Sequence, residues 1–281
     1  MAVLLFIMIS LLVYQLVFNN NSINTHEDPP FTNENFDGWG LNLVNPNRLA
    51  NSETIDIAIL DSGIYKNHNS LKGIVIKQYN AISSKQEVID DFGHGTAVAG
   101  IIYGISPNVN FYDVKILNSE GAGTIDSLIE GIHWSIDQGV DMINISSGVQ
   151  IDDERLYDAI KLATSNNIIV IASAGNTYGL GVDYPAKYKE VISVNAINED
   201  LVKTPFSAKG KIDVVGPGVD IVSTDNLGGY SHFDGSSFAT AHVTGVISYL
   251  LKEDKEIEIN EYIQPIEGDS KYYGAGIIKI E

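Results

Sequence analysis

The chain has 281 residues, of which 44% are hydrophobic, enough for one large core or two modest ones. Its formal net charge of −19 repels phosphate backbones, which argues against a nucleic-acid partner, whereas a cationic peptide would be attracted. Cysteine is absent, which rules out disulfides and thiolate zinc sites but does not distinguish the cytosol from an oxidising exterior.

The chain begins with a charge-free apolar stretch, MAVLLFIMISLLVYQLVF, that is long enough to cross a bilayer. Because it lacks a basic start and a small-residue cleavage site, residues 1–18 predict a membrane anchor, with a removable signal segment as the alternative. Residues 19–37 are rich in Asn, Pro and acids without periodicity and predict a polar tether. Residues 38–281 then form the folded domain.

Beyond the tether, Val- and Ile-rich runs alternate with stretches of helical periodicity. The runs have the composition of strands buried on both faces and comprise residues 54–60, 110–117, 140–146, 167–174 and 190–197. The helical stretches comprise residues 93–104, 124–139 and 152–167. This alternation predicts an α/β fold with a mostly parallel central sheet and helices on both faces. Sites in such sheets gather at the carboxyl ends of the strands.

Four chemically active side chains fall at the ends of these elements. Asp61 closes a strand in AILDSGI, and Asn176 follows another in NIIVIASAGN. His94 begins a helix in DDFGHGTAVAG, and Ser237 begins another in GSSFATAH. Each has an ordinary role on its own, as a turn residue or a helix cap. Together they supply the acid, base, hydroxyl and amide donor that an activated serine nucleophile needs.

The order Asp61, His94, Ser237 separates the classes of serine hydrolase. Chymotrypsin-type enzymes run His, Asp, Ser, α/β-hydrolases run Ser, acid, His, and subtilisin-type enzymes run Asp, His, Ser. No G-x-S-x-G motif occurs. His242, the only His after Ser237, lies on the same predicted helix and is badly placed to be its base.

The motifs AILDSGI, DFGHGTAVAG and GSSFATAHVTG resemble those of the subtilisin-like serine proteases, known as subtilases or peptidase family S8. The resemblance covers about residues 39–281 and implies a three-layer subtilisin-like fold and a serine endopeptidase with Asp61, His94 and Ser237 as its triad. Alignment to the Ser motif places Ser236 where the family usually has Thr, as a turn and packing residue.

The remaining motifs imply where the substrate lies. ASAGNTYG resembles the segment that supplies the oxyanion donor, here Asn176. Asp183, before YPAKY, is expected at the floor of the S1 pocket, where it would favour Lys or Arg at P1. Further substrate contacts are implied for Gly121, Ala122 and Gly123, and for Ser146, Ser147 and Gly148.

Compact subtilases without a propeptide include peptidases that trim leaders from lanthipeptide precursors, and residues 19–37 are too short for a folding-assisting propeptide. The expected function is therefore a dedicated precursor or leader-peptide processing protease. A general degradative extracellular subtilisin is the alternative, and a non-catalytic peptide-binding module is a remote one.

The resemblance also bears on cofactors and location. The short connection YGISPNVN implies that the tight calcium loop of many secreted relatives is missing. No cofactor is expected to be required and no metal ligand is assigned, and a weak calcium site elsewhere in the chain is the alternative. The expected partners are a peptide or protein substrate and, through residues 1–18, a membrane. The expected location is extracytoplasmic, anchored or secreted, with the cytoplasm as the alternative.

Overall fold

The computed structural model describes residues 38–45, 54–253 and 258–280. The predicted anchor and tether, residues 1–18 and 19–37, lie outside the described residues. Among the helices that are described, none has the length and apolar character needed to span a bilayer.

A nine-stranded sheet forms the centre of the domain, in the order β10-β11-β7-β6-β5-β4-β1-β3-β2. Every neighbouring pair is parallel except β10 and β11 at one edge. The strands are β1 (Ile55–Asp61), β2 (Val75–Asn80), β3 (Val109–Lys115), β4 (Met142–Ile145), β5 (Ile169–Ser173), β6 (Ile192–Ile197), β7 (Val214–Pro217), β10 (Ile263–Gln264) and β11 (Ile277–Ile278). The predicted parallel sheet is confirmed.

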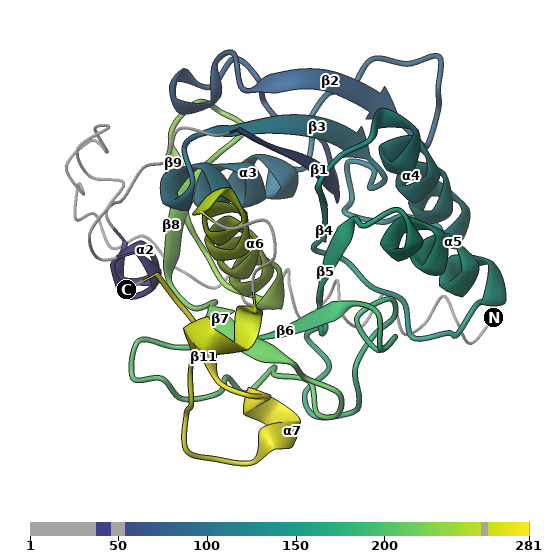
Figure 1. Ribbon diagram of the computed structural model, residues 1–281. Coiled ribbons are helices and arrows are strands. Elements are labelled where there is room, and N and C mark those ends of the chain that lie inside the picture. The colour runs from purple at the N-terminus through teal and green to yellow at the C-terminus, as the bar shows by residue number, and fades with distance from the viewer. Residues whose placement is uncertain (1–37, 46–53, 254–257, 281) are drawn as a thin grey trace. The chain divides into compact units, whose positions relative to one another are not determined.

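Helices cover both faces of the sheet. Figure 1 shows α3 (His94–Ile105) and α6 (Ser236–Glu253) on one face and α4 (Ile125–Gln138) and α5 (Glu154–Ser165) on the other. The three layers predicted from the sequence are therefore present. The remaining elements are α2 (Trp39–Val44), η2 (Asn69–Leu71), the hairpin β8 (Ile221–Thr224) and β9 (Tyr230–Phe233), η3 (Ile259–Tyr262) and α7 (Ser270–Tyr273).

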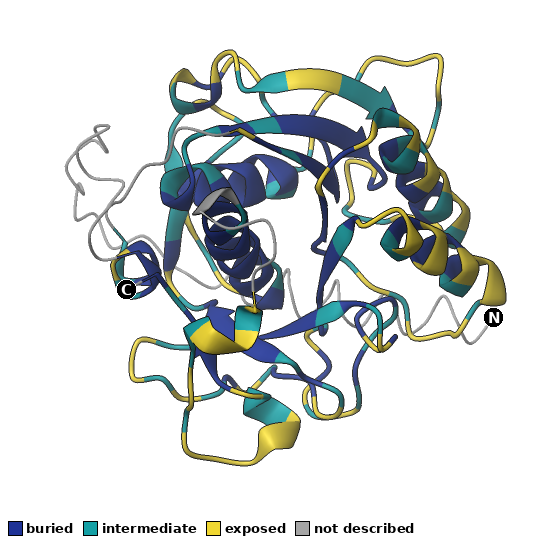
Figure 2. Ribbon diagram, in the orientation of Figure 1, coloured by how far each residue is buried: buried dark blue, intermediate teal, exposed yellow. Residues whose placement is uncertain are grey.

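The two helix pairs differ in burial. Figure 2 shows α3 and α6 buried along most of their length, whereas α4 and α5 expose their outer sides. The reason is position, because α6 packs against the sheet, α3 and α2 at once. A helix enclosed in this way buries every side, and each residue from Ala239 to Leu250 is buried.

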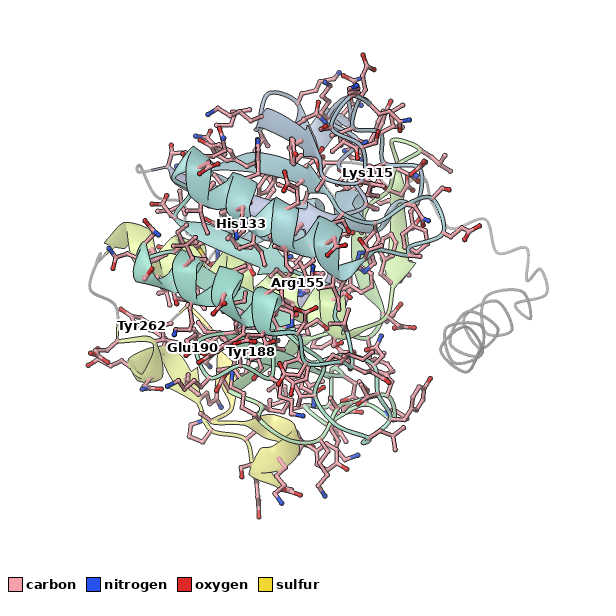
Figure 3. All side chains as sticks on the ribbon, turned by 90° about the vertical axis from the view of Figure 1, so that its right-hand side faces the viewer. Lys115, His133, Arg155, Tyr188, Glu190 and Tyr262 are labelled. Atoms are coloured by element: carbon pink, nitrogen blue, oxygen red, sulfur yellow. The ribbon has the colours of Figure 1, made fainter. Side chains whose placement is uncertain are left out.

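Polar side chains fix the ends of α4 and α5. Oγ1 of Thr124 accepts the backbone N–H of Ser127 at 3.0 Å and so caps α4. Asp153 caps α5 by accepting the N–H of Arg155 at 2.9 Å. Arg155, labelled with His133 in Figure 3, also donates to Asp126 in the first turn of α4 at 2.7 Å. The outer layer is thus joined at the amino ends of its helices.

Candidate active site

A buried acid and a histidine meet where β1 ends and α3 begins. Asp61 is the last residue of β1 and is 0% exposed, and His94 is the first residue of α3. Nδ1 of His94 lies 2.8 Å from Oδ1 and 2.9 Å from Oδ2 of Asp61. Because a carboxylate only accepts hydrogen bonds, Nδ1 carries the proton and Nε2 is left with its lone pair. This is the tautomer that a general base requires.

The surroundings of His94 favour its protonated form. Burial lowers the pKa of His94, but the charge and hydrogen bond of Asp61 and the charge of Asp90 outweigh burial and raise the pKa above its usual value. The ring still reaches solvent, because the side chain is 19% exposed. His94 can therefore take up a proton readily and exchange it with a bound molecule.

Asp90 holds the Asp61 turn and the start of α3 together. One of its oxygens accepts the N–H of Gly93 at 2.7 Å and the hydroxyl of Ser62 at 2.8 Å. The other accepts the N–H of Thr96 at 3.0 Å. Because these partners flank Asp61 and His94, Asp90 fixes both halves of the pair. This role is not evident from the sequence alone, although Asp90 opens the motif DDFGHGTAVAG.

Lys115 braces the same turn from the neighbouring strand. It ends β3 in register with Asp61, and its ammonium donates to the carbonyl of Ser62 at 2.6 Å and to Asp91 at 2.8 Å. The side chain is 8% exposed and is labelled in Figure 3. This contact was not predicted, because Lys115 reads in the sequence only as part of a strand.

Asp113, also on β3, is a buried acid that the sequence analysis did not identify. Its Oδ2 accepts the N–H of Ile64 at 3.0 Å and the amide of Gln78 at 2.9 Å, while Oδ1 has no partner among the described residues. Burial raises the pKa of Asp113 to about 7, although its hydrogen bonds to Gln78 and Ile64 oppose the shift. Asp113 therefore gains charge near neutral pH, close behind the Asp61 turn.

This pKa predicts a pH-dependent loss of stability. An acid whose pKa is raised on folding stabilises the native state below its unfolded pKa, and the stability is lost as the pH rises to the folded value. For Asp113 that window runs from about pH 4 to about pH 7 and is worth up to about 4 kcal/mol. Both proteins should carry Ser237→Ala, which replaces the expected nucleophile. As the pH rises through this window, the Tm of the protein with Asp113→Asn should increase relative to the Tm of the protein that retains Asp113. Parallel melting curves at every pH would contradict the assignment.

Ser237 lies in the first turn of α6, beside the histidine. Its Oγ donates to the carbonyl of Ser146 at 2.7 Å, and the Oγ of Ser146 donates back to the carbonyl of Ser237 at 3.2 Å. The rings of His94 and Phe238, the next residue, are 5.2 Å apart between centroids. Within the described residues no hydrogen bond joins Ser237 to His94. The structure thus brings the serine and the histidine close together, with the serine hydroxyl bound to the first residue after β4.

Asn176 is held by the serine next to Ser237. Its Oδ1 accepts the N–H of Ser236 at 3.1 Å and the Ser236 hydroxyl at 2.9 Å. Ser236 is 1% exposed, and its hydroxyl also contacts that of Ser173 at 2.7 Å. The Nδ2 of Asn176, an exposed residue, has no partner among the described residues. Ser236 therefore does more than the turn and packing role expected of it, because it orients the amide of Asn176.

His242 is remote from this chemistry. It is 0% exposed, and its Nδ1 donates to the carbonyl of Phe238 in its own helix at 2.8 Å. Burial lowers its pKa to about 4. It stays neutral inside the core, in agreement with the expectation that it would be badly placed as a base.

The glycine segment forms a tight turn near the histidine loop. Ala122 uses both its N–H and its carbonyl in hydrogen bonds to Asn118, at 3.0 Å and 2.9 Å. Gly121 has a φ of +70°, and a Cβ there would lie 2.6 Å from the ring of Phe92. Glycine is therefore required on both counts. Gly121 also donates its N–H to the carbonyl of Asn118 at 3.0 Å, and Gly123 forms an antiparallel bridge with Leu117, so the turn is held by its own backbone contacts. Contacts of Gly121, Ala122 and Gly123 with a substrate stay a prediction.

The expected substrate contacts Ser146, Ser147 and Gly148 follow β4, next to Asp183. Val149 and Tyr184 exchange backbone hydrogen bonds of 2.8 Å and 2.7 Å, which places the two segments side by side. A Cβ on Gly148 would lie 2.7 Å from the Cβ of Asp183, and a Cβ on Gly175 would overlap its carboxylate. The half-buried carboxylate of Asp183 thus lies between the segments that carry Ser146 and Asn176.

The chain is similar to proteins of one known family. The model of the subtilase family matches residues 52–266. Subtilisin DY from Bacillus licheniformis is 32% identical over 267 residues, covering 86% of this chain and 97% of the relative. An intracellular serine protease from Paenibacillus polymyxa is 38% identical over 219 residues, covering 71% of this chain and 67% of the relative.

A solved structure shows the same fold. The S41 psychrophilic protease superposes with a TM-score of 0.78 at 22% identity, over 86% of this chain and 98% of its own. The family match over most of the domain and the similarity to subtilisin DY establish the membership that the motifs implied. The chain belongs to the subtilase family of serine endopeptidases.

Proposed function

We propose that Asp61, His94 and Ser237 form the catalytic triad of this peptidase. The observation that carries the proposal is the buried Asp61–His94 hydrogen bond, which leaves Nε2 of His94 as a base beside the first turn of α6. The Ser237 hydroxyl turns from the Ser146 carbonyl to Nε2 when substrate binds. A helix amino terminus surrounds Ser237 with a positive partial charge, which favours the anion formed in the reaction.

Catalysis then proceeds in two stages, acylation and deacylation. Oγ of Ser237 bonds to the scissile carbonyl carbon while its proton passes to Nε2 of His94, and the carbonyl oxygen becomes an oxyanion held by the Ser237 N–H and Nδ2 of Asn176. The C–N bond breaks, His94 protonates the departing amine, and an acyl-enzyme remains. Water next gives a proton to His94 and attacks the ester carbon, and Ser237 leaves with its proton restored.

Labelling with phenylmethylsulfonyl fluoride tests this proposal. The reagent is expected to form a sulfonyl adduct on Ser237, located by peptide mass mapping, with parallel loss of peptide hydrolysis. His94→Ala should abolish labelling, because no base then activates the hydroxyl. An absence of adduct and of hydrolysis would instead support the non-catalytic peptide-binding module.

We further propose that Asp183 selects Lys or Arg at P1. Its carboxylate is half-buried, has no hydrogen-bond partner among the described residues, and lies beside Gly148 and Gly175. Burial alone raises its pKa to about 6, so the group is charged at neutral pH without an internal cation. A buried, unpaired carboxylate gains most from a cationic ligand, because pairing offsets its lost hydration.

A peptide series differing only at P1 measures this preference. At about pH 8, kcat/KM for Arg or Lys should exceed that for Leu or Phe by about 10–100-fold, the worth of a charged hydrogen bond. The ratio should fall below about pH 6 as Asp183 is protonated, and the ratio cancels the titration of His94. Asp183→Gly should remove the preference, whereas Asp158→Asn on the exposed face of α5 should retain it. Equal rates for basic and apolar P1 residues would overturn the assignment.

We infer a dedicated processing role, of the leader-trimming type, from this selectivity. Cleavage confined to basic P1 residues, by a chain of net charge −19 that attracts cationic peptides, suits a protease with few substrates. Cleavage of a peptide library after many residue types would favour the general degradative alternative.

We place the enzyme outside the cytoplasm because of the charge-free residues 1–18, with the membrane as a partner through them. The relative named as intracellular keeps the cytoplasm as the alternative, which cell fractionation decides.

A further inference from the structure

Lys211 lies in a cage of oxygen atoms away from the catalytic residues. Its ammonium donates to the carboxylate of Asp213 at 2.6 Å, to the carbonyl of Ala186 at 3.2 Å and to the carbonyl of Val191. The two carbonyls mark the ends of one segment, which includes Tyr188, labelled in Figure 3. One ammonium therefore ties both ends of residues 186–191 to the start of β7.

Two of the three residues whose oxygens form the cage are buried. Ala186 and Val191 are 0% and 1% exposed. Asp213 is oriented by Ser193, whose N–H and hydroxyl donate to the same Oδ2 at 2.8 Å and 3.0 Å. The side chain of Lys211 is 28% exposed, so solvent reaches the cage from one side.

Backbone carbonyls and a carboxylate are the ligands that hard cations such as Ca²⁺ take in proteins. In this chain the ammonium already occupies their centre, so a calcium ion does not fit beside Lys211. Among the described residues, no group of three or more His, Asp or Glu side chains offers an alternative metal site. We infer that Lys211 is a built-in cation, which spares the segment a metal ion and hides a latent calcium site.

Lys211 holds the place that a metal ion would otherwise take. Removal of the ammonium leaves two buried carbonyls and one carboxylate around an opening, and a hard cation from solution should enter it. The unsubstituted chain should not respond to calcium at this place. This inference is independent of the proposed catalysis, because it concerns stability and ion binding and can be tested in inactive Ser237→Ala protein.

Lys211→Ala is the test, in the Ser237→Ala chain and with choline chloride matching the ionic strength. Its Tm should fall by about 5 °C or more without calcium, since two charged hydrogen bonds and an ion pair are lost. About 10 mM calcium chloride should restore about 3–5 °C, as expected for a millimolar site. Calorimetric titration should count one more bound ion per chain than in the protein that retains Lys211.

Two controls keep the result decisive. Lys209→Ala removes a neighbouring lysine that pairs with Asp269 on the surface at 3.5 Å, and should gain no calcium response. Lys211→Ser also leaves the opening free for an ion, and serves as the second variant if Lys211→Ala does not fold. A loss of Tm that calcium fails to restore in either variant would overturn the inference. An equal calcium response in the chain that retains Lys211 would also overturn it.

Discussion

Ser237→Ala is expected to lower kcat for peptide hydrolysis by about 10⁶-fold, which is the loss that removal of the nucleophile causes in subtilisin, a member of the same family. The variant keeps the Asp61–His94 pair and the buried packing of α6, so substrate binding and Tm should change little. Active-site titration with a burst substrate, followed by measurement of kcat and KM, checks both parts of the expectation.

The neighbouring serine provides the matched control. Ser236→Ala deletes a hydroxyl that holds Oδ1 of Asn176, but the backbone N–H of Ser236 still donates to that oxygen at 3.1 Å. Most activity should therefore remain, with a loss of about tenfold at most. Equal losses in the two variants would show that the nucleophile has been assigned to the wrong serine.

Asn176→Leu should lower kcat by about 10²–10³-fold with little change in KM, again a magnitude known from subtilisin. The reason is that Nδ2 donates to a charge that exists only in the transition state. Leu preserves the volume of the side chain but has no donor. A main effect on KM would mean that Asn176 binds the ground state instead.

The double variant gives a second check on the oxyanion role. In the Ser237→Ala background water attacks in place of Oγ, so the oxyanion is no longer aimed at Nδ2 by the serine, and Asn176→Leu should cause a much smaller further loss than in the active enzyme. A loss as large as in the active enzyme would point to damage elsewhere in the fold. Comparing the two backgrounds therefore separates catalysis from structure.

The central strands and helices could be predicted because local pattern and burial coincide there. Ile57, Ile59 and Leu60 in β1 are 0% exposed, so a continuous apolar run marks the strand. The edge strand β2 was not predicted, because its half-exposed sequence VIKQYN lacks such a run. The hairpin β8–β9 was missed as well, since its residues pack on α3 rather than in the main sheet.

The residues that support the site were harder to predict than those expected to react. Asp61, His94 and Ser237 lie at element ends and carry recognisable motifs. Asp113, in contrast, meets Ile64 across 49 positions of sequence, and Lys115 meets Ser62 across 53. Such contacts depend on the register of β1 and β3, which no local pattern determines. The orientation of Asn176 by Ser236 is likewise a tertiary contact.

The enclosure of α6 links the chemistry to the integrity of the whole domain. Ser237 lies in the first turn of α6, which the sheet, α3 and α2 surround, and most of this helix has no access to water. A helix of this kind exchanges its amide protons only through global opening, not through local fraying. Residual activity in denaturant should therefore report the fraction of molecules that remain folded.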